Sequence, residues 1–244
     1  MDDRRFQHLY GLGAVAVAIL LGLFFVSGAL KDIRKGNEEV TVTGSARRPI
    51  RSDFVVWRFT VSVQSSSMVA ASQELSRGTA RVRAFLKEQG VADSLLTVRP
   101  VEASGVSETL PDGRETGRVI ATRLSQAFEI RSYDVDGVTK VSQQASALIA
   151  EGVPLQPSSP EYLYTKLGDI RAGLLEDATR DAKQRAEAIA KSTDRTVGAV
   201  RDARMGVFQI TPRFSTEISD YGVSDVSSIE KDVTAVVRAT FQLK

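Results

Sequence analysis

The sequence has 244 residues, of which 42% are hydrophobic and 25% are charged, so the chain can bury a sizeable core. Its formal net charge is +2, and removing the five basic and three acidic residues of positions 1–35 leaves 27 of each sign. A domain without net charge lacks the basic surface that phosphate binding requires, which excludes nucleic acid as a main partner. The absence of cysteine excludes disulfides, thiolate nucleophiles and cysteine-ligated metals.

The first predicted element is a transmembrane anchor. Residues 1–8 form a short tail, and the 22 residues of Leu9–Leu30 contain no charge. A helix of that length reaches about 33 Å, which is enough to cross a hydrocarbon core of roughly 30 Å. Basic residues flank the run on both sides, so their number does not decide its orientation. The alternative is a signal peptide cleaved after Ala29, although the apolar run is longer than is usual for such a segment.

Residues 31–38 form a polar connector to a domain that spans residues 39–244. Alternation of apolar and polar residues predicts strands over Glu39–Ala46 and Phe54–Gln64. Met68–Gln89 changes to helical spacing, and Gly90 ends this helix. Its expected apolar face consists of Val69, Leu75, Val82, Phe85 and Leu86.

The next two predicted strands, Leu95–Gly105 and Arg118–Arg131, are joined by the polar stretch Ser107–Gly117. This stretch contains a turn signal, because proline presets φ and glycine permits a positive φ. It therefore predicts a long hairpin whose tip is a candidate contact for self-association. The tip residues are Pro111, Asp112 and Gly113.

Asp134 is expected to cap a helix that continues to about Ala150, and Val153–Thr165 follows as a strand. The buried row of this helix is expected to contain Val138, Val141, Ala145 and Leu148. The order from Phe54 to Thr165 is thus β-α-β-β-α-β, the split βαβ motif.

Leu167–Lys191 is the clearest predicted helix, and two strands over Ala199–Thr211 and Lys231–Leu243 close the chain. Small side chains in the apolar stripe of this helix would let it lie close to whatever it covers. The stripe consists of Ile170, Leu174, Ala178, Ala182, Ala186 and Ile189. The predicted fold class is α+β, with antiparallel sheets, about three helices and an N-terminal transmembrane helix.

Several of these segments together resemble the SIMPL (DUF541) family over roughly residues 38–244: EVTVTGSA, LEDATRDAKQRAEAIAKS, GAVRDARMG and KDVTAVVRATFQL. The resemblance implies an α+β domain that is exported to the bacterial periplasm or held at the cell envelope. Some members assemble into rings, and some are linked to oxidative-stress tolerance. The family has no established catalytic residues that could be transferred. Asp194 stands where a glycine is expected to end the late helix, which puts the geometry of that turn in question.

Residues capable of catalysis are sparse. His8 is the only histidine and lies beside the membrane segment, which excludes a histidine base or a histidine metal site from the domain. Ser228 and Lys231 have the Ser-x-x-Lys spacing of some hydrolases, but a chance pairing at the boundary between a loop and a strand explains it better.

Acidic and basic clusters also have simple structural interpretations. Asp134 with Asp136, or Asp220 with Asp225, could ligate a cation, yet a helix cap and a solvated loop explain them better. Trp57 is expected in the core rather than at a ligand. Three arginines after the connector are candidate contacts for anionic lipid headgroups, and an ordinary solvated loop explains them equally well. They are Arg47, Arg48 and Arg51.

The expected protein is a non-enzymatic, single-pass protein of the inner (cytoplasmic) membrane that acts by forming a homo-oligomer. Its anchor would be Leu9–Leu30, and its domain would lie in the periplasm or outside the cell. No catalytic, cofactor or metal residues are predicted. One alternative is a binding module for a lipid or apolar ligand, and the other is a Ser/Lys hydrolase that uses Ser228.

Overall fold

The computed structural model describes residues 38–217, 219 and 221–244, and the predicted anchor Leu9–Leu30 lies outside them. Among the described residues, no helix combines the length and the apolar character that a membrane crossing needs. The chain forms two compact units, each assembled from distant segments. The first unit contains the described residues up to Arg47 together with Ala172–Phe208 and Thr234–Lys244, and the second contains Arg48–Arg171 and Gln209–Val233.

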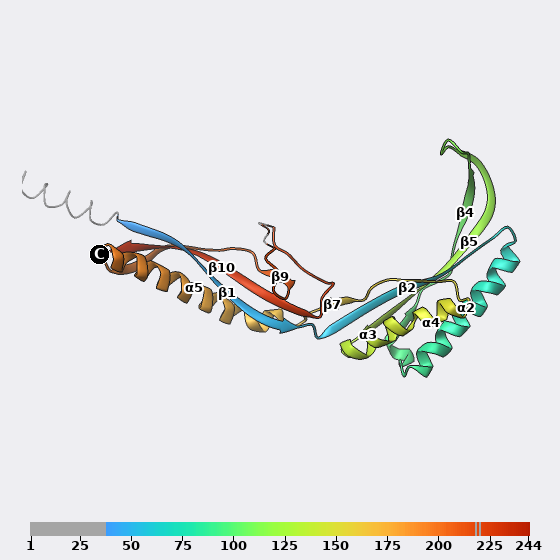
Figure 1. The fold of residues 1–244 in the computed structure, drawn as a ribbon, viewed down its shortest axis with the longest axis horizontal. Helices are drawn as coiled ribbons and strands as arrows, with labels where there is room; N and C mark the ends of the chain where they lie inside the picture. The colour runs from blue at the N-terminus through green and yellow to red at the C-terminus, as the bar shows by residue number, and fades with distance from the viewer. Residues whose placement is uncertain (1–37, 218, 220) are drawn as a thin grey trace, which may run out of the picture. The chain divides into compact units, whose positions relative to one another are not determined.

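The first unit is a helix packed on a sheet, and Figure 1 shows that helix alongside the first and last strands. The strands β1, β10 and β8 pair in that order, and β9 also pairs with β10. β10 and β8 are antiparallel. The bounds are β1 Glu39–Arg51, α5 Leu167–Ser192, β8 Val197–Met205 and β10 Glu230–Leu243. β9 (Gln209–Pro212) and the first residues of β10 belong to the second unit.

The backbones of α5 and β1 approach unusually closely at Gly44. A methyl group at this position would lie 2.2 Å from the carbonyl oxygen of Ala178 and 2.3 Å from the amide nitrogen of Ala182, so only glycine fits. The core beside this contact is small and consists of Val42, Ala182, Ala186, Ala239 and Phe241. The prediction that alanines bring this helix close to its neighbour is therefore confirmed.

The stripe predicted for this helix needs one correction at its C-terminal end. Its buried residues recur every four positions: Leu174, Ala178, Ala182, Ala186 and Ala190. Ile189 was predicted to belong to this row, but its side chain is 45% exposed. The row keeps strict i+4 spacing, so Ala190 occupies the buried position and Ile189 is displaced around the helix.

The second unit is built on a six-stranded sheet in the order β3–β5–β2–β6, with β4 paired to β5 and β7 paired to β2. This order confirms the split βαβ arrangement, in which the first and third strands of the motif are central neighbours. The long central pair β2 and β5 is antiparallel. The strands are β2 Phe54–Ser65, β3 Leu96–Val98, β4 Glu102–Thr109, β5 Glu115–Ser132, β6 Leu155–Pro157 and β7 Glu161–Leu163.

Three predicted helical regions are confirmed as α2 (Met68–Glu88), α3 with α4 (Val135–Gln144 and Ser146–Ala150) and α5, and a short 3₁₀ turn, η1, covers Asp93–Leu95. The predicted caps are also confirmed. The carboxylate of Asp134 accepts a hydrogen bond from the Gly137 N–H at 2.9 Å.

Gly90 follows the end of α2 with φ of 77°. The prediction that Val69 lies on the buried face of α2 is wrong, because this side chain is 68% exposed. It lies six positions from Leu75, which places it about 120° around the helix.

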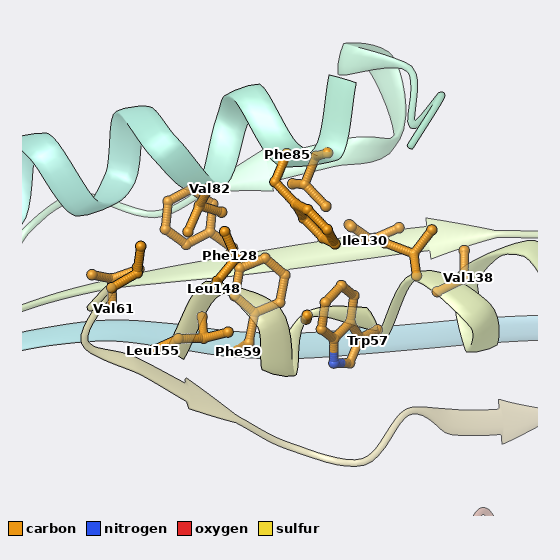
Figure 2. Close-up of a cluster of buried hydrophobic side chains, with 14 of the residues drawn as sticks. Trp57, Phe59, Val61, Val82, Phe85, Phe128, Ile130, Val138, Leu148 and Leu155 are labelled. Carbon is orange, nitrogen blue, oxygen red and sulfur yellow. The ribbon is translucent and has the colours of Figure 1, made fainter. Parts of the chain in front are cut away.

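The core of the second unit fills the space between α2 and the sheet, as Figure 2 shows. Trp57, Phe59 and Phe128 form an aromatic row in it. Phe59 stacks on Phe128 with ring centroids 5.2 Å apart, and Trp57 lies 4.3 Å from Phe59. The indole N–H of Trp57 donates to the Ser158 carbonyl at 2.9 Å. The prediction that Trp57 is a core residue is confirmed.

Three predicted strands are each divided in two. Pro100 separates β3 from β4, Pro160 lies between β6 and β7, and Gly206 begins the gap between β8 and β9. Proline cannot donate to a strand ladder, and glycine weakens one, which accounts for the interruptions. β1, in contrast, continues five residues beyond its predicted end at Ala46 and reaches Arg51.

Candidate functional site

A largely exposed part of the second unit is the ribbon, which we define as residues 101–122 of β4, β5 and their turn. It extends away from the helices of its unit (Figure 1). The two strands pair from Glu102 opposite Ser125 to Thr109 opposite Glu115. Within the described chain β4 pairs only with β5, so its other edge is open. The predicted long hairpin is therefore confirmed.

The three predicted tip residues lie in the turn of the ribbon and are all exposed. Gly113 has φ of 84°. Its N–H donates to the Leu110 carbonyl at 2.9 Å. Arg114 Nε donates to Asp112 Oδ2 at 2.8 Å, and Pro111 precedes that aspartate. The turn thus has the proline and glycine chemistry that the sequence indicates.

Apolar side chains of the ribbon are open to solvent. Val119 is 61% exposed and Ile120 is 46% exposed, and Val101 and Leu110 are also exposed. The register of the ribbon shifts at Ile120, since Val106 pairs with Ala121 and Ser107 with Val119, so Ile120 is an unpaired residue beside Val119. A two-stranded ribbon without a covering layer is marginally stable in water, and an open strand edge is a template for pairing. This arrangement can support protein–protein association.

A buried ion pair lies at the beginning of β10, in the second unit. Lys231 is 1% exposed. Its Nζ donates to the Tyr162 carbonyl at 2.8 Å and to the Asp225 carbonyl. The same atom lies 3.4 Å from Asp225 Oδ2. Since an ammonium group has three N–H bonds, these three acceptors satisfy it.

The carboxylate of Asp225 is held by further donors. It accepts from the Ser227 hydroxyl at 2.6 Å, the Ser227 N–H at 2.9 Å and the Ser228 N–H at 3.2 Å. Burial opposes its ionisation, but these hydrogen bonds and the charge of Lys231 outweigh burial and lower the pKa of Asp225 to about 2. Burial lowers the pKa of Lys231, and its attraction to Asp225 partly offsets that effect. The pair fixes the loop before β10.

The same cluster accounts for the Ser-x-x-Lys spacing. The Ser228 carbonyl accepts from the Ser52 hydroxyl at 3.3 Å, and the Ser228 N–H donates to the Asp225 carboxylate. Within the described residues, no hydrogen bond joins the Ser228 hydroxyl to Lys231. A lysine whose donors are all engaged is poorly placed to remove a proton from serine. The hydrolase interpretation therefore gains no support from this geometry.

The three arginines predicted as lipid contacts lie on β1 rather than in a loop. Arg47 is exposed, and Arg48 is half-buried. Arg51 forms ion pairs with Asp136 and Glu230, each at 2.6 Å. Its guanidinium is thus already engaged by two carboxylates, and lipid contact by this cluster stays a prediction.

The candidate cation ligands have structural roles where they are described. Asp134 caps α3 and Asp136 pairs with Arg51. Asp225 pairs with Lys231, and Asp220 lies outside the described residues. No group of three or more histidine, aspartate or glutamate side chains in the described part of the chain is placed to hold a metal ion.

Two features of this unit were missed by sequence reasoning. Lys231 was expected in a strand but not in the core, and no pattern in the sequence distinguishes a buried lysine from an exposed one. Val119 and Ile120 are typical strand residues, so their exposure could not be inferred without knowing that the ribbon lacks a covering layer.

Comparison with known families gives one result. The SIMPL model, described as a protein of unknown function (DUF541), matches residues 40–241. This match includes both compact units. A search of curated proteins found no significant match.

Proposed function

The chain belongs to the SIMPL (DUF541) family, and from this premise and the exposed ribbon we propose that it is a non-enzymatic cell-envelope protein that acts through self-assembly. The observation that carries the proposal is the ribbon, with its exposed apolar side chains and the open edge of β4. A second copy of the chain is the partner that covers these surfaces.

The charges of the ribbon favour a like partner over a strongly charged one. Both signs are present, and they pair locally: Arg118 with Glu108 at 2.6 Å, and Arg114 with Asp112 at 2.8 Å. A surface of mixed, internally paired charge has little long-range attraction for a polyanion or a polycation. Its apolar side chains and backbone groups remain for contact with an identical ribbon.

Membrane attachment through Leu9–Leu30 supports the same proposal, because confinement to one surface raises the effective concentration of copies. The domain is proposed to lie in the periplasm or outside the cell. A C-terminal alkaline phosphatase fusion should then be active, and a C-terminal green fluorescent protein fusion should be dark. The reverse pattern would reject export.

The mass of the full-length chain in detergent tests the assembly. Wild type should form a defined oligomer, and the double variant Val119→Lys/Ile120→Lys should be a monomer at the same concentration. Val69→Lys is the matched control, because Val69 is a similarly exposed apolar residue of the same unit that lies on α2. A monomeric wild type, or an oligomer that survives the double variant, would contradict the proposal.

A further inference from the structure

A hollow of about 440 Å³ lies in the second unit beside α3 and the segment between β6 and β7. Six of its nine described lining residues carry a hydroxyl group, and none carries a charge. The hydroxyl groups come from three parts of the unit: α3, the segment from Ser158 to Tyr162, and the loop before β10. This convergence distinguishes the hollow from an ordinary gap between side chains.

Four of the six hydroxyl protons of this lining are committed to acceptors of the protein itself. Two of these hydroxyl groups belong to α3: Thr139 donates to the Val135 carbonyl at 2.6 Å, and Ser142 donates to the Thr139 carbonyl at 2.8 Å. The Thr139 hydroxyl also donates toward the Tyr162 hydroxyl oxygen at 3.1 Å, so this contact does not use the Tyr162 proton.

The serines of the other two segments follow the same rule. Ser158 donates to the Arg58 carbonyl, and Ser227 donates to Asp225 Oδ1 at 2.6 Å. Four hydroxyl groups of the lining therefore offer a ligand lone pairs only, whereas Tyr162 and the Gln143 side-chain amide can also donate to it.

A lining of this kind selects its ligand by hydrogen-bond polarity. An anion would meet lone pairs without a cationic partner, and an apolar ligand would leave those lone pairs unsatisfied. A cation would lose its hydration without a carboxylate in the lining to replace it. A neutral molecule with many O–H donors satisfies the lone pairs, and the rings of Pro157 and Pro160 offer apolar surface to its C–H groups.

We infer that this hollow binds a neutral saccharide. The inference does not depend on self-assembly, since all the lining residues belong to the second unit of one chain. The site also has a built-in reporter. Trp57 is the only tryptophan, and its indole N–H donates to the carbonyl of Ser158, which lines the hollow.

The test is a titration of the full-length chain, purified in a detergent without a sugar headgroup, with two neutral tetrasaccharides, maltotetraose and the fully N-acetylated chitotetraose. At least one should change the Trp57 emission saturably, with a Kd of roughly 1 mM or below. Saturation-transfer NMR should detect the same ligand. Ser142→Ala or Gln143→Ala should weaken binding at least about fivefold, the effect of one hydrogen bond.

Ser146→Ala is the matched control. The Ser146 hydroxyl donates to the Gln143 carbonyl at 3.0 Å. Ser142 likewise donates to the carbonyl three residues before it, but Ser146 does not line the hollow. Its removal should leave the saccharide affinity unchanged. Absence of saturable binding, equal weakening by the control variant, or tighter binding of inorganic phosphate or of a fatty acid would overturn the inference.

Discussion

The two units use opposite ways to bring secondary structure together. In the first unit a helix approaches a strand so closely that Gly44 faces the backbone of α5, and alanine supplies most of the buried stripe. In the second unit the helices stand off from the sheet, and an aromatic row fills the space. One interface depends on the absence of side-chain volume, and the other depends on its presence.

This difference teaches that burial alone does not show what a position tolerates. Ala182 and Phe128 are both almost completely buried. A residue in the close interface has no room for growth, because added atoms would meet backbone that cannot rotate away. A residue in the filled interface cannot be shortened without leaving a cavity. The two units should therefore respond to opposite kinds of substitution.

The largest effect is expected from removing volume in the second unit. Phe128→Ala should lower the free energy of unfolding by about 4 kcal/mol, because it removes a stacked ring and leaves a cavity. Chemical denaturation followed by Trp57 emission measures this. Val69→Ala, at an exposed position of α2, should change the stability by less than about 0.5 kcal/mol. Similar losses for the two variants would mean that the aromatic row is not tightly packed.

The second effect comes from adding volume in the first unit. Gly44→Ala should cost about 3 kcal/mol, because the new methyl group would overlap the backbone of α5. Gly168→Ala is the matched control, since a methyl group there meets no atom within 4 Å. It should leave stability unchanged or raise it by up to about 1 kcal/mol. Thermal unfolding by circular dichroism compares the two, and equal midpoints would disprove the close approach.

The sequence predicted what depends on local pattern. The period-two alternation of Phe54–Gln64 and the capping position of Asp134 both have local causes, and both are confirmed. The split βαβ order follows from the sequence of elements, so it too could be predicted.

What could not be predicted depends on which elements meet. In the sequence, Gly44 cannot be distinguished from any other glycine in a strand, because its steric role depends on the packing of α5 against it. A lone lysine in a strand is expected to be solvated, so no local sequence pattern predicts the burial of Lys231. Serine and threonine are frequent on every surface, which conceals the convergence of Ser142, Ser158 and Ser227 on one hollow. The hollow thus appears only after the fold is assembled, whereas the hairpin of the ribbon and its tip residues could be predicted from the sequence.

Acidification should destabilise the second unit through its buried ion pair. The pKa of Asp225 is about 2 in the folded state and 3.8 ordinarily, so its contribution is fully present above pH 3.8 and is lost as the pH falls through 2. The difference corresponds to about 2 kcal/mol. Stability between pH 5 and 2 should therefore fall less steeply in the double variant Asp225→Asn/Lys231→Met. Identical slopes for that variant and wild type would show that the pair does not couple folding to protons.

The smallest expected effect concerns the turn after α5 in the first unit. Asp194 has φ of 53°, so the turn keeps the left-handed conformation although the expected glycine is absent. The Arg195 N–H closes the turn by donating to the Ala190 carbonyl at 2.8 Å. Asp194→Gly should relieve the strain of a side chain at positive φ and raise stability by about 0.5 kcal/mol, the larger flexibility of unfolded glycine offsetting part of the gain.

Two further variants test whether the backbone conformation of Asp194 or its carboxylate determines the stability of this turn. Asp194→Val should lower stability by about 1–2 kcal/mol, because a β-branched residue adopts positive φ poorly. Asp194→Asn should match wild type within about 0.5 kcal/mol, since asparagine tolerates the same conformation and lacks the charge. Denaturation midpoints rank the three variants. If Asp194→Asn lowered stability as much as Asp194→Val, the charge of Asp194 rather than its backbone conformation would stabilise this turn. Another contact would then have to fix the C-terminal end of α5.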